Sequence, residues 1–307
     1  MFEVHGLLAD KQQAIFQRYS SMSLTLLLQG LAIGLVNGAL YILTALGLTL
    51  IYGILHIVNF AHGEVFMLGA MLVYVVYVLW EWPLLAALPA IALTAAVVGW
   101  LVERGIFRRL RGQWLQLLVA TVGVSLIIQS LSWLVFGAQE KNVPSILPGV
   151  LVAWGIRMPY ERLAAAGIAM CMVAALYAVV YKTRSGLAMR AIEEDEETAR
   201  MLGIDTDKVA GLAVALGFAL AAMGGVFVAP IYSINPGMGL EAILMSFIII
   251  IIGGLGNITG TLVAGLFIGV VQSMGALLLG AESAHVLVFV VMIAVLIFRP
   301  QGLMGKL

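Results

Sequence analysis

The residue types that carry catalytic or metal chemistry are sparse in this sequence. It holds four histidines and one cysteine, and the His-Glu-x-x-His pattern of a zinc protease does not occur. Cys171 lies inside an apolar run, which excludes a disulfide framework and predicts a small, buried side chain. A Gly-x-x-x-x-Gly-Lys-Ser/Thr loop is also absent, so another chain must supply the ATP site if ATP drives the work of this one. The sequence therefore predicts no catalytic residue, no metal site and no cofactor.

A short polar run interrupts the apolar sequence at Asn59, His62 and Glu64. His62 and Glu64 are two positions apart, so they cannot share one face of a helix. Polar residues and a glycine between two apolar runs are typical of a broken or re-entrant membrane segment, whose freed backbone groups must face protein or water. Residues 253–260 repeat this character in the second half of the chain. The candidates for a translocation path, each with the capping of a helix end as the equal alternative, are Asn59, His62, Glu64 and Asn257.

The most polar stretch of the sequence is residues 184–208. Asp195 is suited to cap the N-terminus of a helix, and Gly203 is suited to a left-handed stop at its end. A short helix of about two turns is therefore predicted between them. Ala199 and Leu202 share one side of it at i, i+3 spacing. Such a helix is suited to docking on a partner protein; a solvated acidic loop is the alternative, and composition alone favours that alternative.

Membrane-spanning helices must position these residues. The chain has 307 residues, of which 63% are hydrophobic and 10% charged, and its mean hydropathy is +1.09. Soluble domains carry roughly 25% charged residues. With 16 basic and 16 acidic residues the net charge is zero, so no global field recruits nucleic acid. A bilayer span needs about 20 apolar residues, and most of the uncharged intervals reach that length. These intervals are residues 19–63, 65–80, 82–102, 112–139, 163–181, 209–240, 242–281 and 283–298.

Continuous apolar runs without two-residue alternation favour helices over a β-barrel. We therefore expect an all-α, polytopic integral membrane protein with about eight or nine spans, some of them broken or re-entrant, in one transmembrane domain over residues 1–307. Residues 242–281 are long enough for two helices with a turn at 253–257. Residues 24–54 would form a helix of about 45 Å, longer than the ~30 Å hydrocarbon core, so a tilt or a break is expected there.

The basic residues orient these spans, because Lys and Arg collect in short cytoplasmic loops. Most of the 16 basic residues fall in three regions that we expect on the cytoplasmic side. These are Arg104, Arg108, Arg109 and Arg111; Lys182, Arg184, Arg190, Arg200 and Lys208; and Arg299 with Lys306. The loop at 139–162 then lies outside, between spans near 115–136 and 162–181. Residues 1–23 are interpreted as an uncleaved leader. Three spans before Arg104 place this leader outside, and a break in the first run would reverse that.

The cores of the long apolar runs carry no ionisable group. Proton- or sodium-coupled carriers normally keep some such groups at mid-span, where they are expensive. Here four carboxylates stand at run boundaries, where contact with interfacial water is expected: Glu64, Glu81, Glu241 and Glu282. This disfavours ion-coupled transport and leaves a passive pore or an externally driven pathway.

Glycines recur every fourth residue at Gly30, Gly34 and Gly38, and again at Gly265 and Gly269. This spacing allows close contact between helices in lipid. Tight packing of many helices suits a transporter body better than a single anchor.

Three stretches of the sequence resemble one family. Residues 197–203, Glu-Thr-Ala-Arg-Met-Leu-Gly, resemble the Glu-x-Ala-x-x-x-Gly coupling loop of ABC importer permeases. Residues 57–70 and 253–260 are very similar to signatures of the LivH-type permease of branched-chain amino acid or amide importers. The resemblance extends from about residue 28 to residue 302. It departs from the generic pattern at Thr198, which replaces a small apolar residue, and in the dense acidic run 193–197.

The resemblance implies a multi-pass transport subunit of the bacterial inner membrane that is not an enzyme and binds no cofactor. It implies as partners a second related permease, two ATP-binding subunits, a periplasmic solute-binding protein and the lipid bilayer, but no nucleic acid. Coupling to the ATPase carries over onto Asp195, Glu197, Ala199 and Gly203. The implied solutes are branched-chain amino acids, with urea, short amides or other amino acids as alternatives. A stand-alone channel for a small neutral solute is a further alternative, but it gives no reason for a capped acidic helix.

Overall fold

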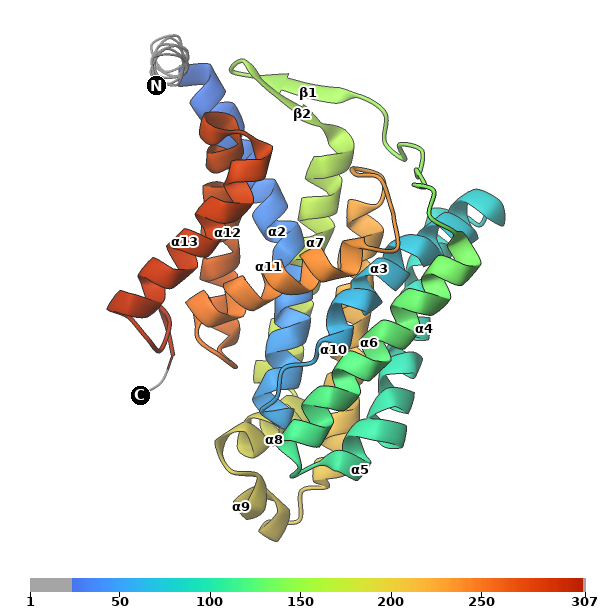
Figure 1. Ribbon diagram of the computed structural model, residues 1–307, viewed down its shortest axis with the longest axis vertical. Coiled ribbons are helices and arrows are strands. Elements are labelled where there is room, and N and C mark those ends of the chain that lie inside the picture. Colours follow the sequence, from blue (N-terminus) through green and yellow to red (C-terminus); the bar gives the residue numbers. More distant parts are fainter. Residues whose placement is uncertain (1–23, 306–307) are drawn as a thin grey trace, which may run out of the picture.

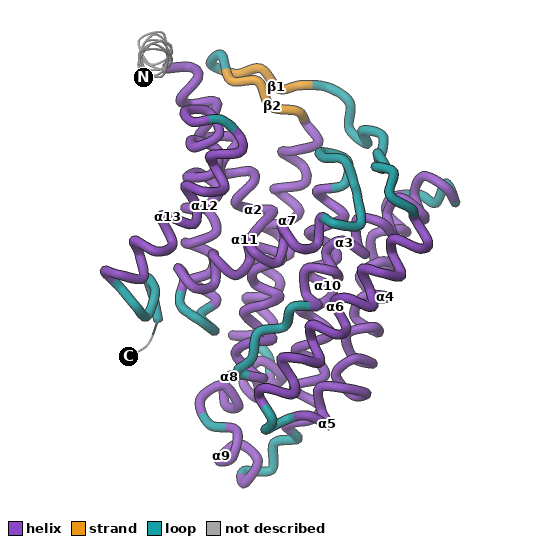
Figure 2. Tube along the Cα trace, viewed as in Figure 1, coloured by secondary structure: helices purple, strands orange, loops and turns teal. Residues whose placement is uncertain are grey.

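The structure is a computed structural model that describes residues 24–305, so the leader at 1–23 and Lys306 lie outside the described residues. Long helices make up nearly all of this part, and a β-hairpin lies at one end (Figures 1 and 2). The elements are α2 (Leu24–Leu55), α3 (Ala61–Val73) with the π-helical turn η1 (Tyr74–Leu79), α4 (Leu84–Val102) with the π-helical turn η2 (Glu103–Phe107), α5 (Arg108–Leu110), α6 (Trp114–Phe136), β1 (Val150–Ala153), β2 (Ile156–Pro159), α7 (Tyr160–Lys182), α8 (Arg184–Glu194), α9 (Glu196–Met201), α10 (Thr206–Val228), α11 (Met238–Gly253), α12 (Ile258–Leu279) and α13 (Ala281–Phe298).

The expected number of membrane-spanning helices is confirmed. Within residues 24–305, eight helices are long and apolar enough to cross a membrane, and α11 is a shorter apolar helix. The predicted spans near 115–136 and 162–181 correspond to α6 and α7, and the predicted turn at 253–257 separates α11 from α12. The fold is mostly helical, with the hairpin as its one departure from an all-α architecture among the described residues.

The β-hairpin lies in the segment that we expected only as an outer loop. Its strands β1 and β2 pair antiparallel, with Val152 opposite Arg157. The turn is made by Trp154 and Gly155, which both have positive φ angles, 52° and 81°. Two hydrogen bonds anchor the hairpin to α2, because the Gln29 amide donates to the Arg157 carbonyl at 2.7 Å and accepts from the Arg157 N–H at 2.7 Å.

Helix α2 is continuous over 32 residues, so the break that we considered in the first apolar run is absent. At 1.5 Å per residue the helix is about 48 Å long, which leaves tilt as the way to fit a bilayer. Three helical crossings, α2, α3 with η1, and α4 with η2 and α5, precede Arg111. The hairpin and the start of α2 lie at one end of the molecule, and α5, α8 and α9 lie at the other (Figure 1). The basic clusters predict that the latter end is cytoplasmic, and we refer to it below as the cytoplasmic end.

The glycine repeats form a close contact between α2 and α12, as their spacing predicted. A Cβ atom on Gly34 would lie 2.7 Å from the Val270 Cα, and one on Gly38 would lie 2.8 Å from the Gly265 carbonyl oxygen. The Ser273 hydroxyl donates to the Gly30 carbonyl across the same contact at 2.7 Å. Small residues thus let the two backbones touch where lipid provides no hydrophobic driving force.

Helix α7 packs on the bundle by one face only. Its buried residues recur every three or four positions, at Ala165, Ala169, Val173, Leu176 and Val180. Cys171 falls on the opposite face, and its side chain is exposed. The predicted burial of Cys171 is therefore wrong, because an apolar run in a membrane helix does not show which face meets the protein.

The C-terminal segment joins the cytoplasmic end of the bundle. The Leu303 and Met304 N–H groups donate to the carbonyls of Ile252 and Gly253, at 2.7 and 3.1 Å. The turn that follows α11 is close to α8, because a Cβ atom on Gly256 would lie 3.3 Å from a carboxylate oxygen of Glu193. The residues after α13 therefore lie on the side to which we assigned Arg299.

Candidate functional site

The segment between α7 and α10 folds into two short helices rather than one. Helix α8 begins after Thr183, whose hydroxyl accepts a hydrogen bond from the Gly186 N–H at 3.1 Å. The chain then becomes extended at Asp195, with φ −161°, and continues as α9. We predicted only the second helix, because the acidic residues at the end of α8 obscure the boundary between the two.

Asp195 and Gly203 bound α9 as predicted. One carboxylate oxygen of Asp195 accepts from the N–H groups of Glu197 and Thr198, at 2.9 and 3.1 Å, and the other accepts from the Thr198 hydroxyl. These bonds, above all the one from the Thr198 hydroxyl, lower the pKa of Asp195. The charged cap is therefore present at neutral pH and is lost only as the pH falls through that lowered pKa. Gly203 has a φ of 85°, the left-handed value that ends a helix without strain for glycine.

The surface of α9 differs from the predicted one. Ala199 is 2% exposed and faces the bundle, whereas Met201 and Leu202 are 76% and 78% exposed at the helix tip. The prediction that Ala199 and Leu202 share one docking side at i, i+3 spacing is therefore wrong. Leu202 is the C-terminal cap of α9, where the chain leaves the helix toward Gly203. Glu197 is exposed beside this tip. The coupling roles of Asp195, Glu197, Ala199 and Gly203 stay predictions.

A cluster of four charged side chains lies where α9 leads into α10, and we name it the cytoplasmic ion cluster: Glu103, Arg108, Arg111 and Asp207. The Arg111 guanidinium donates to Glu103 at 2.6 Å and to Asp207 at 2.7 Å. Arg108 adds ion pairs to the same carboxylates at 3.5 and 3.6 Å. The Glu103 side chain is fully buried, whereas that of Asp207 is 45% exposed.

The cytoplasmic ion cluster ties the start of α10 to the end of α4. Arg200 extends the connection to α9, since it bonds both Glu196, at 2.8 Å, and the Thr206 hydroxyl, at 3.2 Å. The sequence analysis missed the cluster because Glu103 and Asp207 are far apart in the chain. The one available signal was a single glutamate next to four arginines at the end of an apolar run.

The polar run at 59–64 marks a helix break, as predicted. After α2 ends, residues 56–60 lead to α3, which begins near the middle of α2, because the His62 Nε2 lies 2.9 Å from the Thr44 carbonyl oxygen. The Asn59 side chain accepts from the Ala61 N–H at 3.1 Å and so caps the break. The chain therefore re-enters the bundle after α2, and α3 begins inside the bundle rather than at its surface.

Glu64 is buried, at 3% exposure, so the expectation that it meets interfacial water is wrong. The helix break carries it into the bundle, where the Ser125 hydroxyl of α6 donates to it at 3.3 Å. His62 instead faces α2 and the Phe218 ring of α10, which confirms that the two side chains do not share a face. Asn59 Nδ2, His62 Nδ1 and Glu64 Oε2 have no hydrogen-bond partner among the described residues.

Asn257 lies in a different part of the molecule from Glu64. Its side chain accepts from the Gly260 N–H at 2.8 Å and donates to the Met304 carbonyl at 2.6 Å, so it caps α12 and holds the C-terminal segment. Helix α11 separates the two sites, because Glu64 touches Gly239 near its start and Asn257 follows its end. That Asn257 lines the translocation path stays a prediction.

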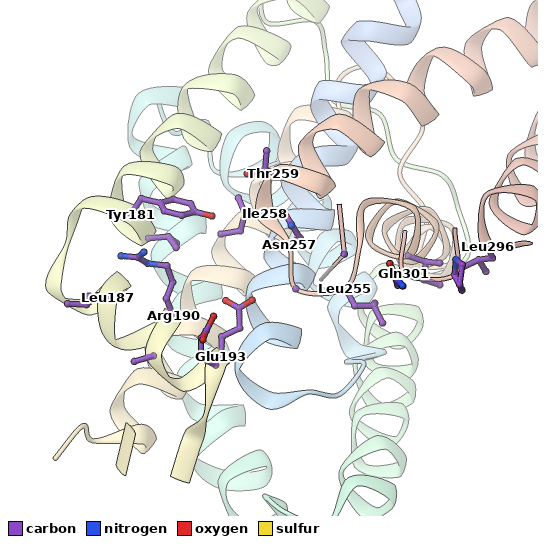
Figure 3. Close-up of a pocket in the computed structure, with 17 residues that line it drawn as sticks. Tyr181, Leu187, Arg190, Glu193, Leu255, Asn257, Ile258, Thr259, Leu296 and Gln301 are labelled. Carbon is purple, nitrogen blue, oxygen red and sulfur yellow. The ribbon is translucent and has the colours of Figure 1, made fainter. Parts of the chain in front are cut away.

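A cavity of about 850 Å³ lies at the cytoplasmic end between α7, α8, the turn after α11 and the C-terminal segment. Figure 3 shows Tyr181 and Arg190 on one side of it and Leu255 and Asn257 across from them. The Arg190 guanidinium stacks over the Tyr181 ring at 5.2 Å. The cavity thus adjoins both α8 and the second helix break. Residues 24–305 contain no group of three or more His, Cys, Asp or Glu side chains placed to hold a metal ion.

Comparison with known proteins finds relatives that cover nearly the whole chain. Residues 30–296 match the family described as "Branched-chain amino acid transport system / permease component". The high-affinity branched-chain amino acid transport system permease protein BraD of Pseudomonas aeruginosa is 34% identical over 294 residues, which cover 91% of this chain and 96% of BraD. The corresponding LivH proteins of Salmonella typhimurium and Escherichia coli K12 are each 32% identical over 295 residues, with 91% and 96% coverage.

Proposed function

Because the chain belongs to the family of permease components of branched-chain amino acid transport systems, we propose that it forms part of the path by which an ATP-driven importer moves branched-chain amino acids. It is a multi-pass membrane subunit of an ABC transporter, a transport subunit rather than an enzyme, and such subunits carry no cofactor. Membership of the family implies ATPase and binding-protein partners. The family match over residues 30–296, nearly the whole described chain, is the observation that carries the proposal.

The complete assembly contains a second related permease beside this chain, two ATP-binding subunits on the cytoplasmic side and a periplasmic solute-binding protein outside. The exposed tip of α9 supports the cytoplasmic contact. Met201 and Leu202 are apolar and exposed on the water-facing end, next to the charged Glu197. An apolar patch rimmed by charge is typical of a protein interaction site.

Transport in this proposal is a movement of packed helices, with no covalent step. Closure of the ATP-binding subunits displaces α9, and the bonds from Arg200 to Thr206 and from Arg111 to Asp207 carry the displacement into α10 and α4. Helix α10 is largely buried and packs on α2, α3 and α4, so its movement reaches the centre of the bundle. The two permeases then rock to release the solute inward.

Replacing Gly203 with valine is expected to lower ATP-driven uptake at least tenfold. A Cβ atom at this position meets no neighbour within 4 Å, so the cost comes only from the left-handed backbone, about 1–2 kcal/mol for a β-branched residue. The strain changes the direction in which α9 presents its tip. Gly203→Asn is the matched control, because asparagine tolerates this conformation. Uptake is measured in vesicles that hold all the subunits; unchanged uptake and unchanged co-elution of the ATP-binding subunits would contradict the coupling assignment.

Leucine is expected to be the transported solute, and urea is not. Labelled leucine is given to vesicles that contain the complete transporter with its binding protein. ATP is supplied on the side of the membrane that the ATP-binding subunits face. We expect accumulation that needs ATP and that excess isoleucine or valine abolishes, whereas excess urea leaves it unchanged. Competition by urea but not by isoleucine would assign the chain to the amide class instead.

A further inference from the structure

A groove lies on the outside of the bundle between α4 and α10, close to the cytoplasmic end. Its volume is about 330 Å³. The residues that line it are Ala96, Val97, Trp100, Lys208, Leu212 and Ala215. The two helices run antiparallel here, because Gly99 meets Phe218 whereas Trp100 meets Gly211. Both helices are long and apolar enough to cross a membrane, so the groove starts near the membrane surface and descends between two spans.

Each helix contributes a stripe that changes from apolar to basic toward the cytoplasmic end. On α4, Trp100 is followed one turn later by Arg104. On α10, Ala215 and Leu212 lead back to Lys208 along one face. From Ala215 to Lys208 the rise is about 10 Å, so the groove reaches about a third of the way into a ~30 Å hydrocarbon core.

Trp100 forms the wall at the level where the stripes turn basic. Its ring packs over α10, because a Cβ atom on Gly211 would lie 3.2 Å from the Trp100 Cδ1. The Arg104 guanidinium stacks on the same ring, 5.1 Å from its centre. Trp100 is 41% exposed, and its indole N–H donates to no residue within 24–305. Tryptophan is enriched at the membrane–water interface, where its ring meets apolar chains and its N–H meets polar groups.

The mouth of the groove is positively charged. Residues 103–111 and 205–208 carry five basic and three acidic side chains, which leaves two positive charges unbalanced. Arg104 makes no ion pair with another described residue. Lys208 pairs with Asp205 at 2.9 Å, but the two side chains are 83% and 48% exposed, so water screens the pair. An ammonium has three N–H donors, so Lys208 can also donate to an anion.

We propose that this groove binds an anionic phospholipid of the cytoplasmic leaflet, with its phosphate on Arg104 and Lys208 and one acyl chain along Leu212 and Ala215. Basic pockets between membrane helices on the cytoplasmic side are suited to anionic headgroups. The Trp100 N–H is placed to donate to an ester oxygen of the glycerol backbone. A zwitterionic headgroup adds a cation of its own, which the unbalanced positive charge disfavours.

The bound lipid would contact both helices that the cytoplasmic ion cluster joins. Gly211, under the Trp100 ring, is also close to Glu103, because a Cβ atom there would lie 3.4 Å from the Glu103 Oε2. The lipid site and the cluster are therefore neighbours on the contact between α4 and α10. The proposal does not involve the transported solute, so its failure would leave the proposed function standing.

Photolabelling of the complete transporter tests this proposal. The transporter is placed in phosphatidylcholine nanodiscs that contain a small fraction of phosphatidylglycerol with a diazirine in its acyl chain, or of phosphatidylcholine with the same chain. After illumination, mass spectrometry locates the adducts on this chain. We expect at least fivefold more adduct on residues 96–100 and 208–215 from the phosphatidylglycerol probe. An excess of inorganic phosphate should not change this preference; its loss would mean that the groove binds a free anion instead.

A pair of double variants separates the site from general attraction to the membrane. Arg104→Gln with Lys208→Gln should make the adducts from the two probes equal. Lys182→Gln with Arg184→Gln removes two cations at the same end but outside the groove, and should keep the preference. If the first pair does not assemble with the other subunits, Arg104→Gln alone should at least halve the preference. Equal labelling of the unaltered transporter, no adduct because another subunit covers the groove, or a preference that survives loss of the groove cations would each overturn the proposal.

Discussion

Replacing Glu103 with alanine is expected to lower the free energy of unfolding by about 3 kcal/mol, the lower end of the cost of breaking a buried ion pair. The Glu103 carboxylate is fully buried and receives Arg111 at 2.6 Å and Arg108 at 3.5 Å. Its removal leaves Arg111, which is only 16% exposed, with Asp207 as its remaining charged partner in the cluster. The lower end of the range applies because Asp207 and Arg108 are partly exposed and water screens them.

The same substitution is expected to separate ATP hydrolysis from transport. The cytoplasmic ion cluster links α10 to α4, and without Glu103 the two arginines that bind Asp207 lose the buried carboxylate that holds them against the end of α4, so less of the displacement of α9 reaches α4. We expect the assembled transporter to hydrolyse ATP while the number of leucine molecules moved per ATP falls at least fivefold. Thermal unfolding in detergent gives the stability, and uptake and hydrolysis are both normalised to assembled complex.

Arg109→Ala is the matched control for Glu103→Ala. Arg109 lies in α5 next to Arg108 of the cluster, but takes no part in the ion pairs of the cluster. It should keep both the unfolding midpoint and the ratio of leucine to ATP. A Glu103 variant with unchanged ratio would show that the cluster only stabilises the fold, and a milder variant, Asp207→Asn, tests the same link at a half-exposed position.

Replacing Gly34 with alanine should destabilise the bundle by about 1–3 kcal/mol, the cost of overpacking a filled interior. The added Cβ would lie 2.7 Å from the Val270 Cα and 2.9 Å from the Gly269 carbonyl oxygen. Both are backbone atoms, so no rotamer change relieves the contact, and α2 and α12 must move apart.

Gly123→Ala on α6 is the matched control, because it makes the same chemical change in a helix where nothing lies within 4 Å of the new atom. It should leave stability unchanged or raise it by up to about 1 kcal/mol through helix propensity. Unfolding midpoints of the two purified variants give the comparison. Equal midpoints would mean that the α2–α12 contact does not limit stability.

Local signals in the sequence predicted local structure well. The Asp195 cap and the left-handed Gly203 follow from residue types alone, because capping depends on bonds within a few residues. The glycine spacing likewise predicted a close helix contact. It did not predict which helices meet, since the partner of Gly34 is Val270, at the opposite end of the chain.

Burial was the property that the sequence could not supply. Glu64 stands at the edge of an apolar run, where a helix starting at the membrane surface would leave it in water. In the structure α3 starts inside the bundle, which buries Glu64 against Gly239 and Ser125. The cytoplasmic ion cluster is missed for a related reason, because pairing of distant charges depends on packing and not on spacing.

The contact between α2 and α12 also constrains the order of folding during synthesis. The Ser273 hydroxyl meets the Gly30 carbonyl across 243 positions of sequence. The ribosome therefore finishes nearly the whole chain before the glycine face of its first described span finds its partner, and contacts so distant in sequence form late. Until then that face borders lipid or the insertion machinery. A truncated chain that ends before α12 would therefore leave the glycine face of α2 without its partner. We expect such a chain to be degraded or to pack this face against the wrong helix.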